Sequence, residues 1–446
     1  MRKGLWIILT CLLMISFLVV GCNKDANKEP GNYVSATIEE VKAADVVVDA
    51  RANEAYAGWS TQNNKKGGHI EGATDFSANW LTATYDDKEN LDGMTRDEQL
   101  KQYMENKKID KDSKVVVYDE NGKDAVAVAD YLTSQGVKDI KVFDLNKWED
   151  KLVSYENYKL YVPPVVVKNL IDGKEIPEIG NVDDLKIVEV SWGTEEESGY
   201  LKGHVPGAIH VNSDSFDDED NVYLLEKDSV LFELAKSQGI SVNSTVVVTG
   251  DPIFASRYAV ILKYLGVEEV YVMSGGVSGW TDAGLDLETK SNKGVAIRDF
   301  GATSPKNPDL IDTVAEVKSK LSDSNFMLVD NRTIEEYRGE TSGYSYFDKA
   351  GRIEGAVFGY AGVGNSSSML YYRSLDTTMR NGYEIEAMWK KAGVDTSKHL
   401  SFYCGGGYRA AEILWDAMVL GYDDVSLFAD GWCGWALAGE KSVTGK

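Results

Sequence analysis

The chain repeats one pattern three times, and this repetition limits the folds open to it. In each copy an apolar run ends in an acid, a segment of the form Gly-x-Ile/Val-x-Gly-Ala follows, a second apolar run comes next, and a tryptophan lies near the end. The acid-ending runs are 46–49, 187–189 and 327–330. The second runs are 115–118, 246–249 and 400–403, and the tryptophans are Trp148, Trp280 and Trp435. A repeat of about 140 residues has the size of a domain, not of a solenoid unit.

Apolar strands that alternate with amphipathic helices predict an α/β fold built on parallel sheets. Two helix starts carry a capping box, Thr37-x-x-Glu40 and Thr313-x-x-Glu316. We therefore expect three tandem domains, each a mostly parallel sheet with helices on both faces. Sites in such sheets form at the carboxyl ends of the strands.

The domain boundaries follow from breaks in the pattern. The stretch 291–307, rich in glycine, proline and lysine, is typical of a linker, and a shorter break lies near 161–164. The expected ranges are 35–160 for domain 1, 161–295 for domain 2 and 296–446 for domain 3.

The N-terminus is typical of an export signal. Arg2 and Lys3 precede an apolar run over 5–20 that ends in Val-Val-Gly-Cys22. We expect residues 1–21 to be a lipoprotein signal peptide, Cys22 to carry the lipid and 22–34 to be a linker. An uncut membrane anchor is the alternative, but the run is short for a span. The protein is then expected outside the cytoplasm, in the periplasm or on the cell surface, and bound to the bacterial membrane through its lipid alone.

Charge and cysteine content exclude several classes of protein. The net charge of −24 argues against nucleic acid or an anionic membrane surface as a partner. Beyond Cys11 and Cys22 the chain has only Cys404 and Cys433, too few for a disulfide scaffold. A single Cys404–Cys433 disulfide stays open beside a free, reactive thiol.

The segment 401–412 carries the clearest chemical signal. A strand-like run ends at Cys404, the glycines Gly405, Gly406 and Gly407 follow, and a helix-like segment begins near Arg409. Glycines let successive N–H groups converge on one point, where a helix N-terminus adds partial positive charge. A cysteine there should be partly thiolate and nucleophilic. The alternative role for Cys404 is that of a small buried apolar side chain, and the alternative role for Arg409 is an ion pair at the helix start.

Arginines cluster around this segment. Six of the eleven in the chain lie between residues 332 and 409: Arg332, Arg338, Arg352, Arg373, Arg380 and Arg409. In an acidic protein this clustering favours an anionic substrate, while ordinary ion pairing is the alternative for several of them. His69 and His204 have no neighbouring ligand residues, so neither a metal nor another cofactor is expected.

Taken together, Asp-x-Arg after the first strand, Gly-x-Ile-x-Gly-Ala, a strand that ends in cysteine, and Asp-Gly-x-x-x-Trp resemble the rhodanese (sulfurtransferase) superfamily. The segments 341–346, 377–380, 387–390 and 401–405 look like the exported three-domain thiosulfate sulfurtransferases. Those proteins carry Cys-Gly-x-Gly-x-Arg in the last domain only, and residues 404–409 fit it. Asp119 and Gly250 align with Cys404, so domains 1 and 2 are expected to be inactive and to serve structure or a protein partner. Arg352 stands where the other copies have His69 and His204.

The resemblance implies that Cys404 takes a sulfane sulfur from a small anionic donor and passes it, as a persulfide, to a thiol or cyanide. The loop residues expected to hold the persulfide are Gly405, Gly406, Gly407, Tyr408 and Arg409. Supporting roles, with structural roles as the alternative, fall to Asp330, Arg332, Arg338, Arg352 and Arg380. Cys433 is expected either to resolve an oxidised Cys404 or to fill the core.

Loop length favours sulfur chemistry over phosphate chemistry. Residues 404–409 form Cys-x4-Arg, whereas the related phosphatases and arsenate reductases use Cys-x5-Arg, a cup one residue larger. Thiosulfate is the expected donor. The glycine directly after the cysteine keeps 3-mercaptopyruvate as an alternative, and a membrane-tethered sulfur carrier with little turnover is a further one.

Overall fold

The computed structural model describes residues 31, 33–61, 64–83 and 94–445, and residues 33–446 form one compact unit. The predicted signal peptide and its lipidation site, Cys22, lie outside the described residues. Within the described residues, no helix combines the length and the apolar character needed to cross a bilayer.

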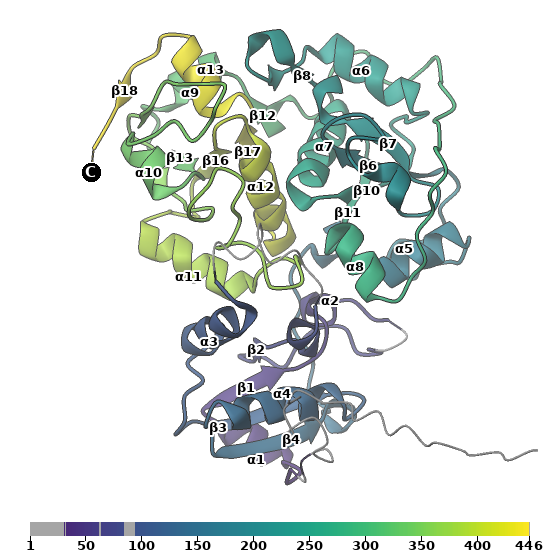
Figure 1. Ribbon diagram of the computed structural model, residues 1–446, viewed down its shortest axis with the longest axis vertical. Helices are drawn as coiled ribbons and strands as arrows, with labels where there is room; N and C mark the ends of the chain where they lie inside the picture. Colours follow the sequence, from purple (N-terminus) through teal and green to yellow (C-terminus); the bar gives the residue numbers. More distant parts are fainter. Residues whose placement is uncertain (1–30, 32, 62–63, 84–93, 446) are drawn as a thin grey trace, which may run out of the picture. The chain divides into compact units, whose positions relative to one another are not determined.

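Domain 1 contains a four-stranded parallel sheet of order β2-β1-β3-β4 (Figure 1). Its strands are β1 (Val46–Asp49), β2 (Thr74–Asp75), β3 (Lys114–Asp119) and β4 (Asp139–Asp144). Its helices are α1 (Ile38–Ala43), α2 (Asn53–Ala57), α3 (Arg96–Asn106) and α4 (Asp124–Ser134). Val115 and Val117 of β3 enter the core with α3 and α4, and Val116 enters the core with α1. Helices therefore cover both faces of the sheet.

Domain 2 contains a five-stranded parallel sheet of order β5-β11-β10-β6-β7. Its strands are β5 (Tyr161–Val162), β6 (Leu185–Ser191), β7 (Ile209–Asn212), β10 (Thr245–Gly250) and β11 (Glu269–Met273). Its helices are α5 (Pro164–Ile171), α6 (Asp228–Ser237), α7 (Pro252–Leu265) and α8 (Gly276–Asp282). A short antiparallel pair joins β8 (Asp217–Asp218) to β9 (Leu224–Leu225).

Domain 3 contains a five-stranded parallel sheet of order β12-β17-β16-β13-β15. Its strands are β12 (Ile311–Asp312), β13 (Phe326–Asp330), β15 (Val357–Phe358), β16 (His399–Tyr403) and β17 (Val425–Phe428). Its helices are α9 (Val314–Lys320), α10 (Ile334–Arg338), α11 (Gly382–Ala392), α12 (Tyr408–Leu420) and α13 (Gly431–Leu437). An antiparallel pair, β14 (Arg352–Ile353) with β18 (Ser442–Val443), lies beside it. Phe402 of β16 enters the core with α11 and α12, whereas Tyr403 enters the core with α9 and α13.

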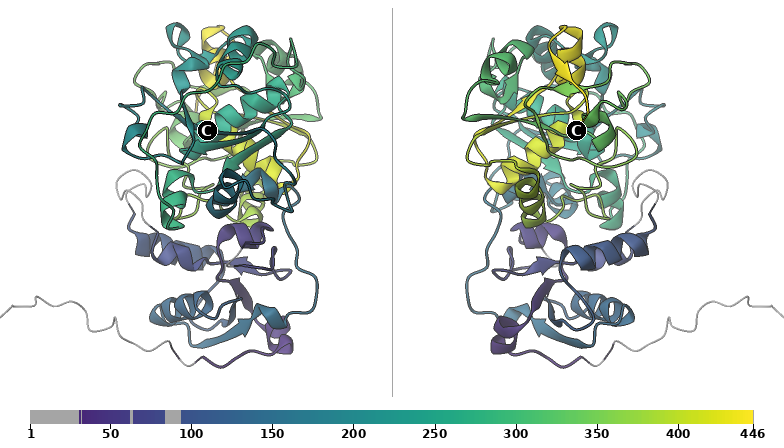
Figure 2. Two further views of the ribbon diagram at one scale, coloured as in Figure 1. Left: turned by 90° about the vertical axis from the view of Figure 1, so that its right-hand side faces the viewer. Right: turned by 90° about the vertical axis from the view of Figure 1, so that its left-hand side faces the viewer.

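The predicted α/β fold of three tandem domains, with parallel sheets flanked by helices, is confirmed. Figure 2 shows the same ribbon from two sides, in the colours of Figure 1. Both predicted capping boxes are present, because Thr37 and Thr313 each accept the backbone N–H of the glutamate three residues on.

Domains 2 and 3 share one hydrophobic core. Helix α12, which follows the Cys404 loop, packs along α7 of domain 2 (Figure 1). Ala259 and Val260 of α7 and Ala410 and Leu414 of α12 belong to the same buried cluster. The position of the Cys404 loop is therefore tied to domain 2 as well as to its own sheet.

Candidate active site

Cys404 lies at the carboxyl end of β16, the central strand of domain 3, and α12 begins four residues later at Tyr408. Its side chain is 2% exposed, and it lines a cavity of about 370 Å³. This is the edge of the sheet at which parallel α/β domains form their sites. The thiol is sheltered, but a small molecule in the cavity would reach it.

The loop after Cys404 presents backbone N–H groups without partners. In the part of the chain that the structure describes, no acceptor takes a hydrogen bond from the N–H of Gly405, Gly406 or Gly407. The carbonyls are satisfied by α13, because Cys404 O accepts from Trp432 N at 2.8 Å and Gly405 O from Cys433 N at 2.9 Å. Unpaired amides next to a helix N-terminus form a cradle for an anion.

Two of the three glycines have no room for a side chain. A Cβ at Gly405 would overlap the Tyr344 hydroxyl. A Cβ at Gly407, whose φ is +85°, would overlap both an Arg257 nitrogen and the backbone oxygen of Ala429. At Gly406 the nearest atom would be a carbonyl oxygen 4.0 Å away. Close packing therefore requires the first and third glycines, and the second lies open to the cavity.

Arg409 is buried and lines the cavity. Its two terminal nitrogens donate to the two carboxylate oxygens of Glu336 at 2.8 and 2.9 Å, and Nη2 also donates to the Tyr344 hydroxyl at 2.7 Å. Burial alone would raise the pKa of Glu336, but the Arg409 guanidinium holds it below its usual range. The ion pair that sequence reasoning kept as an alternative is thus present, and it fixes Arg409 beside the thiol.

Asp330 and Arg332 form a buried pair behind the loop. The guanidinium donates to Asp330 at 2.7 and 2.8 Å and to Gly351 O at 2.9 Å, while Tyr403 also donates its hydroxyl to Asp330. Neither residue lines the cavity. This location agrees with a supporting role for Asp330 and Arg332, outside the cavity.

The remaining predicted arginines lie away from the cavity. Arg338 is near Glu340 at 4.0 Å, and Arg380 donates to Glu384 at 2.7 Å. Arg373 pairs with Glu412 and with Asp251 of domain 2. The clustering seen in the sequence therefore reflects ion pairing and domain contacts for most of the set, and of the six only Arg409 borders the cavity.

Arg352 replaces a histidine in a stacking role. His69 stacks on Tyr56 and His204 on Tyr200, with ring centroids 3.8 and 3.7 Å apart. The Arg352 guanidinium carbon lies 4.5 Å from the ring centroid of Tyr337. All three copies thus place a flat, polar group on a tyrosine, which is a structural contact.

Cys433 and Cys404 are both free and buried. Burial, followed by the neighbouring Cys404, raises the pKa of the Cys433 thiol to about 12. Cys433 is fully enclosed in the core with α13. A packing role suits this thiol better than a nucleophilic one.

Domain 2 forms much of the cavity wall, which sequence reasoning did not predict. The aromatic side chains of the wall are Trp192, Tyr223, Phe254, Tyr344, Tyr346 and Tyr408. Its acids are Asp214 and Asp217, and burial raises the pKa of Asp217 to about 6 although Arg257 opposes the rise. Trp192 and Tyr346 are 61% and 48% exposed. Tyr408 belongs to the predicted loop and Tyr344 and Tyr346 to a segment named above, but no motif in the sequence pointed to the other wall residues.

The positions that match Cys404 are occupied differently in the other domains. Asp119 turns its own carboxylate onto its loop, accepting from Gly122 N at 2.8 Å and Ala125 N at 2.9 Å. In domain 2 a side chain at Gly250 would overlap Val190 O, and α7 begins two residues later. Neither place holds a thiol.

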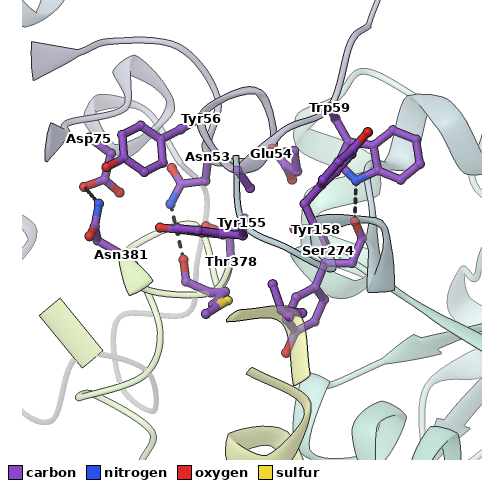
Figure 3. Close-up of a pocket in the computed structure, with 14 residues that line it drawn as sticks. Asn53, Glu54, Tyr56, Trp59, Asp75, Tyr155, Tyr158, Ser274, Thr378 and Asn381 are labelled. Atoms are coloured by element: carbon purple, nitrogen blue, oxygen red, sulfur yellow. Dashed lines mark hydrogen bonds between the residues drawn. The ribbon is translucent and has the colours of Figure 1, made fainter. Parts of the chain in front are cut away.

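A second cavity, of about 30 Å³, lies where the three domains meet (Figure 3). Asn53 and Glu54 of domain 1, Ser274 of domain 2 and Thr378 of domain 3 line it, and no thiol does. It has room for about one water molecule. The cavity at Cys404 is therefore the candidate active site.

A parallel α/β domain whose central strand leads into a cysteine, followed by glycines with unpaired amides and a helix start, is the arrangement expected of a sulfurtransferase domain. The comparisons agree: the rhodanese-like domain model matches residues 32–151, 169–283 and 313–438. The chain belongs to the rhodanese-like family, which confirms the predicted superfamily.

Two similar proteins are named as sulfurtransferases. The thiosulfate sulfurtransferase YnjE of Escherichia coli K12 is 32% identical over 87% of this chain and 86% of its own. The thiosulfate sulfurtransferase of Bos taurus is 28% identical over 62% of this chain and 92% of its own. These relatives support the predicted sulfurtransferase class.

Among solved structures, the anaerobic ergothioneine biosynthesis enzyme of Chlorobium limicola, in complex with trimethyl histidine, superposes with a TM-score of 0.84. It is 30% identical, and the match covers 93% of this chain and all of that one. A structure of the enzyme EanB, with 30% identity and a TM-score of 0.84, is described as carrying a cysteine persulfide with ergothioneine.

Proposed function

We propose that this protein transfers a sulfane sulfur through a persulfide on Cys404. The observation that carries the proposal is the thiol at the edge of a cavity, inside a loop whose glycine N–H groups have no acceptor in the described part of the chain. A terminal persulfide sulfur bears negative charge, and preorganised amides stabilise such a charge without rearrangement.

Two displacements complete the reaction. The Cys404 thiolate attacks the outer sulfur of thiosulfate, the S–S bond breaks, and sulfite leaves with the electron pair. The acceptor, cyanide or a thiolate, then attacks the outer sulfur of the persulfide, and the Cys404 thiolate leaves. Electrons and atoms balance without a cofactor.

We propose thiosulfate as the donor, in line with the names of the relatives. Its sulfonate would meet the loop amides and the N-terminus of α12, with Arg409 at the same wall. The alternative donor, 3-mercaptopyruvate, is named for an Escherichia coli relative 24% identical over 55% of this chain. A side chain at position 405 would overlap the Tyr344 hydroxyl, so this loop position cannot carry a cationic side chain.

A second candidate is transfer to a cationic imidazole acceptor such as hercynine. The cavity wall has six aromatic side chains and two acids, and its one lining cation in the described chain is already paired with Glu336. Aromatic faces beside carboxylates attract quaternary ammonium groups. The similar Chlorobium limicola enzyme binds trimethyl histidine.

One set of assays tests the donor and the acceptor. The purified protein and its Cys404→Ser variant are incubated with thiosulfate or 3-mercaptopyruvate plus cyanide, and thiocyanate is followed together with sulfite or pyruvate. We expect turnover with thiosulfate and none in the variant. Turnover that survives Cys404→Ser would refute the nucleophile. Hercynine with polysulfide, analysed by mass spectrometry for ergothioneine, tests the second candidate.

The sulfur-carrier alternative predicts stoichiometric labelling of Cys404 without turnover in the same assays. A protein partner for domains 1 and 2 stays a proposal and belongs with that outcome. We also propose that Cys22 is lipidated and anchors the protein outside the cytoplasm. Fractionation of cells that express the Cys22→Ser variant tests this, because the variant should leave the membrane fraction.

A further inference from the structure

Domain 2 has no sulfur site of its own, yet it buries a charged pair against the loop of domain 3. Arg257 lies on α7 and Asp217 on β8, and their side chains are 0% and 1% exposed. The two are joined by a hydrogen bond from Nη2 to Oδ1 of 3.2 Å. Burying a charged side chain is costly unless it gains close partners. The other contacts of Arg257 and Asp217 therefore show which part of the protein this pair stabilises.

Those other contacts lie in domain 3. Arg257 Nη1 donates to the backbone oxygen of Ala429 at 3.1 Å. Asp217 accepts the hydroxyl of Tyr408, the first residue of α12, and the Arg257 guanidinium carbon lies 5.3 Å from the centroid of the Tyr408 ring. The pair thus contacts the start of α12 and the residue that follows β17.

Arg257 also fills the space that the third loop glycine leaves empty. A Cβ on Gly407 would overlap its Nη1, so the guanidinium packs directly on the Gly407 backbone. Gly407 and Tyr408 supply the last amides of the cradle and the start of α12. Movement of Arg257 would release the two residues whose N–H groups complete the cradle.

We propose that Arg257 and Asp217, from the inactive domain 2, are positioning residues for the sulfur-binding loop of domain 3. They hold the backbone of Gly407 and Tyr408 so that the loop amides converge on the atom bound to Cys404. This inference rests on the proposed function for the identity of that atom as sulfur. It gives domain 2 a task in the reaction at a site that it does not itself contain.

The test compares Arg257→Met and Arg257→Lys with a matched control, Arg298→Met, which alters an exposed arginine of the linker. The persulfide is loaded first, and the rate constant for its removal by cyanide is measured in a single turnover. We expect Arg257→Met to lower this rate constant about 10²-fold, the loss typical of one misplaced donor, with the donor's KM little changed. Arg257→Lys should recover part of the rate, and Arg298→Met should match the unaltered protein.

Alkylation of Cys404 by iodoacetamide separates positioning from simple loosening. Loss of aligned amides leaves less thiolate and slows alkylation near neutral pH, whereas a loosened cavity admits the reagent faster. Two results for a folded Arg257→Met variant would overturn the proposal. One is that its rates of sulfur transfer and of alkylation both stay within threefold of those of the unaltered protein, and the other is that its alkylation is faster. If Arg257→Met does not fold, Tyr408→Phe removes only the hydroxyl contact with Asp217 and should slow both reactions. If no donor supports transfer in the unaltered protein, the proposed function fails, and the alkylation comparison still decides the positioning role.

Discussion

Replacing Gly407 with alanine, beside the same change at Gly406, tests whether the shape of the loop makes the site. The two glycines are neighbours in one loop, so both changes add the same methyl group to the same segment, at a closely packed position and at one open to the cavity. Gly407 has a φ of +85° and packs on Arg257 and on the Ala429 carbonyl. The Gly406 Cβ would meet nothing closer than 4.0 Å.

The expected cost at Gly407 has two parts. An L-residue in the left-handed region costs about 1–2 kcal/mol. Overpacking against a close-packed core adds about 1–3 kcal/mol, since one of the two overlapped atoms belongs to the backbone and cannot rotate away. Gly407→Ala should therefore lower the free energy of unfolding by roughly 2–5 kcal/mol. Gly406→Ala should change it by less than about 1 kcal/mol.

Urea unfolding followed by tryptophan fluorescence measures the difference, and iodoacetamide alkylation of Cys404 reports on the cradle. We expect Gly407→Ala to be destabilised and slowly alkylated, and Gly406→Ala to be close to the unaltered protein in both. Equal stability and equal alkylation rates for the two variants would refute the account of the loop given above.

Three further outcomes are expected. Glu336→Gln leaves Arg409 buried without its charged partner, which should cost about 3–5 kcal/mol of unfolding free energy in urea melts; a loss below about 1 kcal/mol would mean that the pair is not needed. Trp192→Ala should raise the KM for a trimethylammonium acceptor about 2–5-fold with thiosulfate loading unchanged, because an exposed cation–π contact contributes about 0.5–1 kcal/mol; an unchanged KM would remove Trp192 from the acceptor site. Burial raises the pKa of Glu189 from 4.5 to about 7, so the native state holds its proton more tightly and stability is lost as the pH rises from about 4.5 through 7. Glu189→Gln should abolish that loss and be more stable at pH 8 by up to roughly 3 kcal/mol; parallel pH–stability curves for the two proteins would contradict it.

The fold could be predicted from the sequence because its signals are local and repeated. Each copy has apolar runs that form buried parallel strands, and the capping boxes at Thr37 and Thr313 mark helix starts that the structure has. The Cys404 loop was equally visible, since a cysteine, three glycines and a helix start lie next to one another in the chain.

The cavity wall could not be predicted in the same way. Asp217, Tyr223 and Phe254 reach Cys404 from another domain, through the packing of α7 on α12. No local pattern encodes such a contact, because it depends on which face of each helix two separate domains bury together. For the same reason the arginine cluster was misleading: Arg373 and Arg380 serve contacts between elements that are distant in sequence.

The loop between the central strand and the following helix differs among the three domains. A glycine-rich or turn-rich loop between a strand and a helix leaves N–H groups that need an acceptor, and an anion can serve as one. Domain 1 supplies the anion from its own chain, because the Asp119 carboxylate accepts two amides of its loop. Domain 2 removes the loop, so that Gly250 leads almost directly into α7.

In domain 3 the N–H groups of Gly405, Gly406 and Gly407 have no acceptor among the described residues, and under the proposed function the anion comes from Cys404 and what it carries. The Asp-Arg pair behind the loop is shared by domains 1 and 3, as Asp49–Arg51 and Asp330–Arg332, although only one of these domains has a thiol. That shared pair is therefore a structural feature of the strand end, and we expect the site to depend on the open loop instead. Putting a cysteine at position 119 would restore a thiol, but Glu120, already bound to Arg51, would still lie at the loop. We therefore expect activity in this fold to depend on a loop whose amides no side chain among the described residues satisfies.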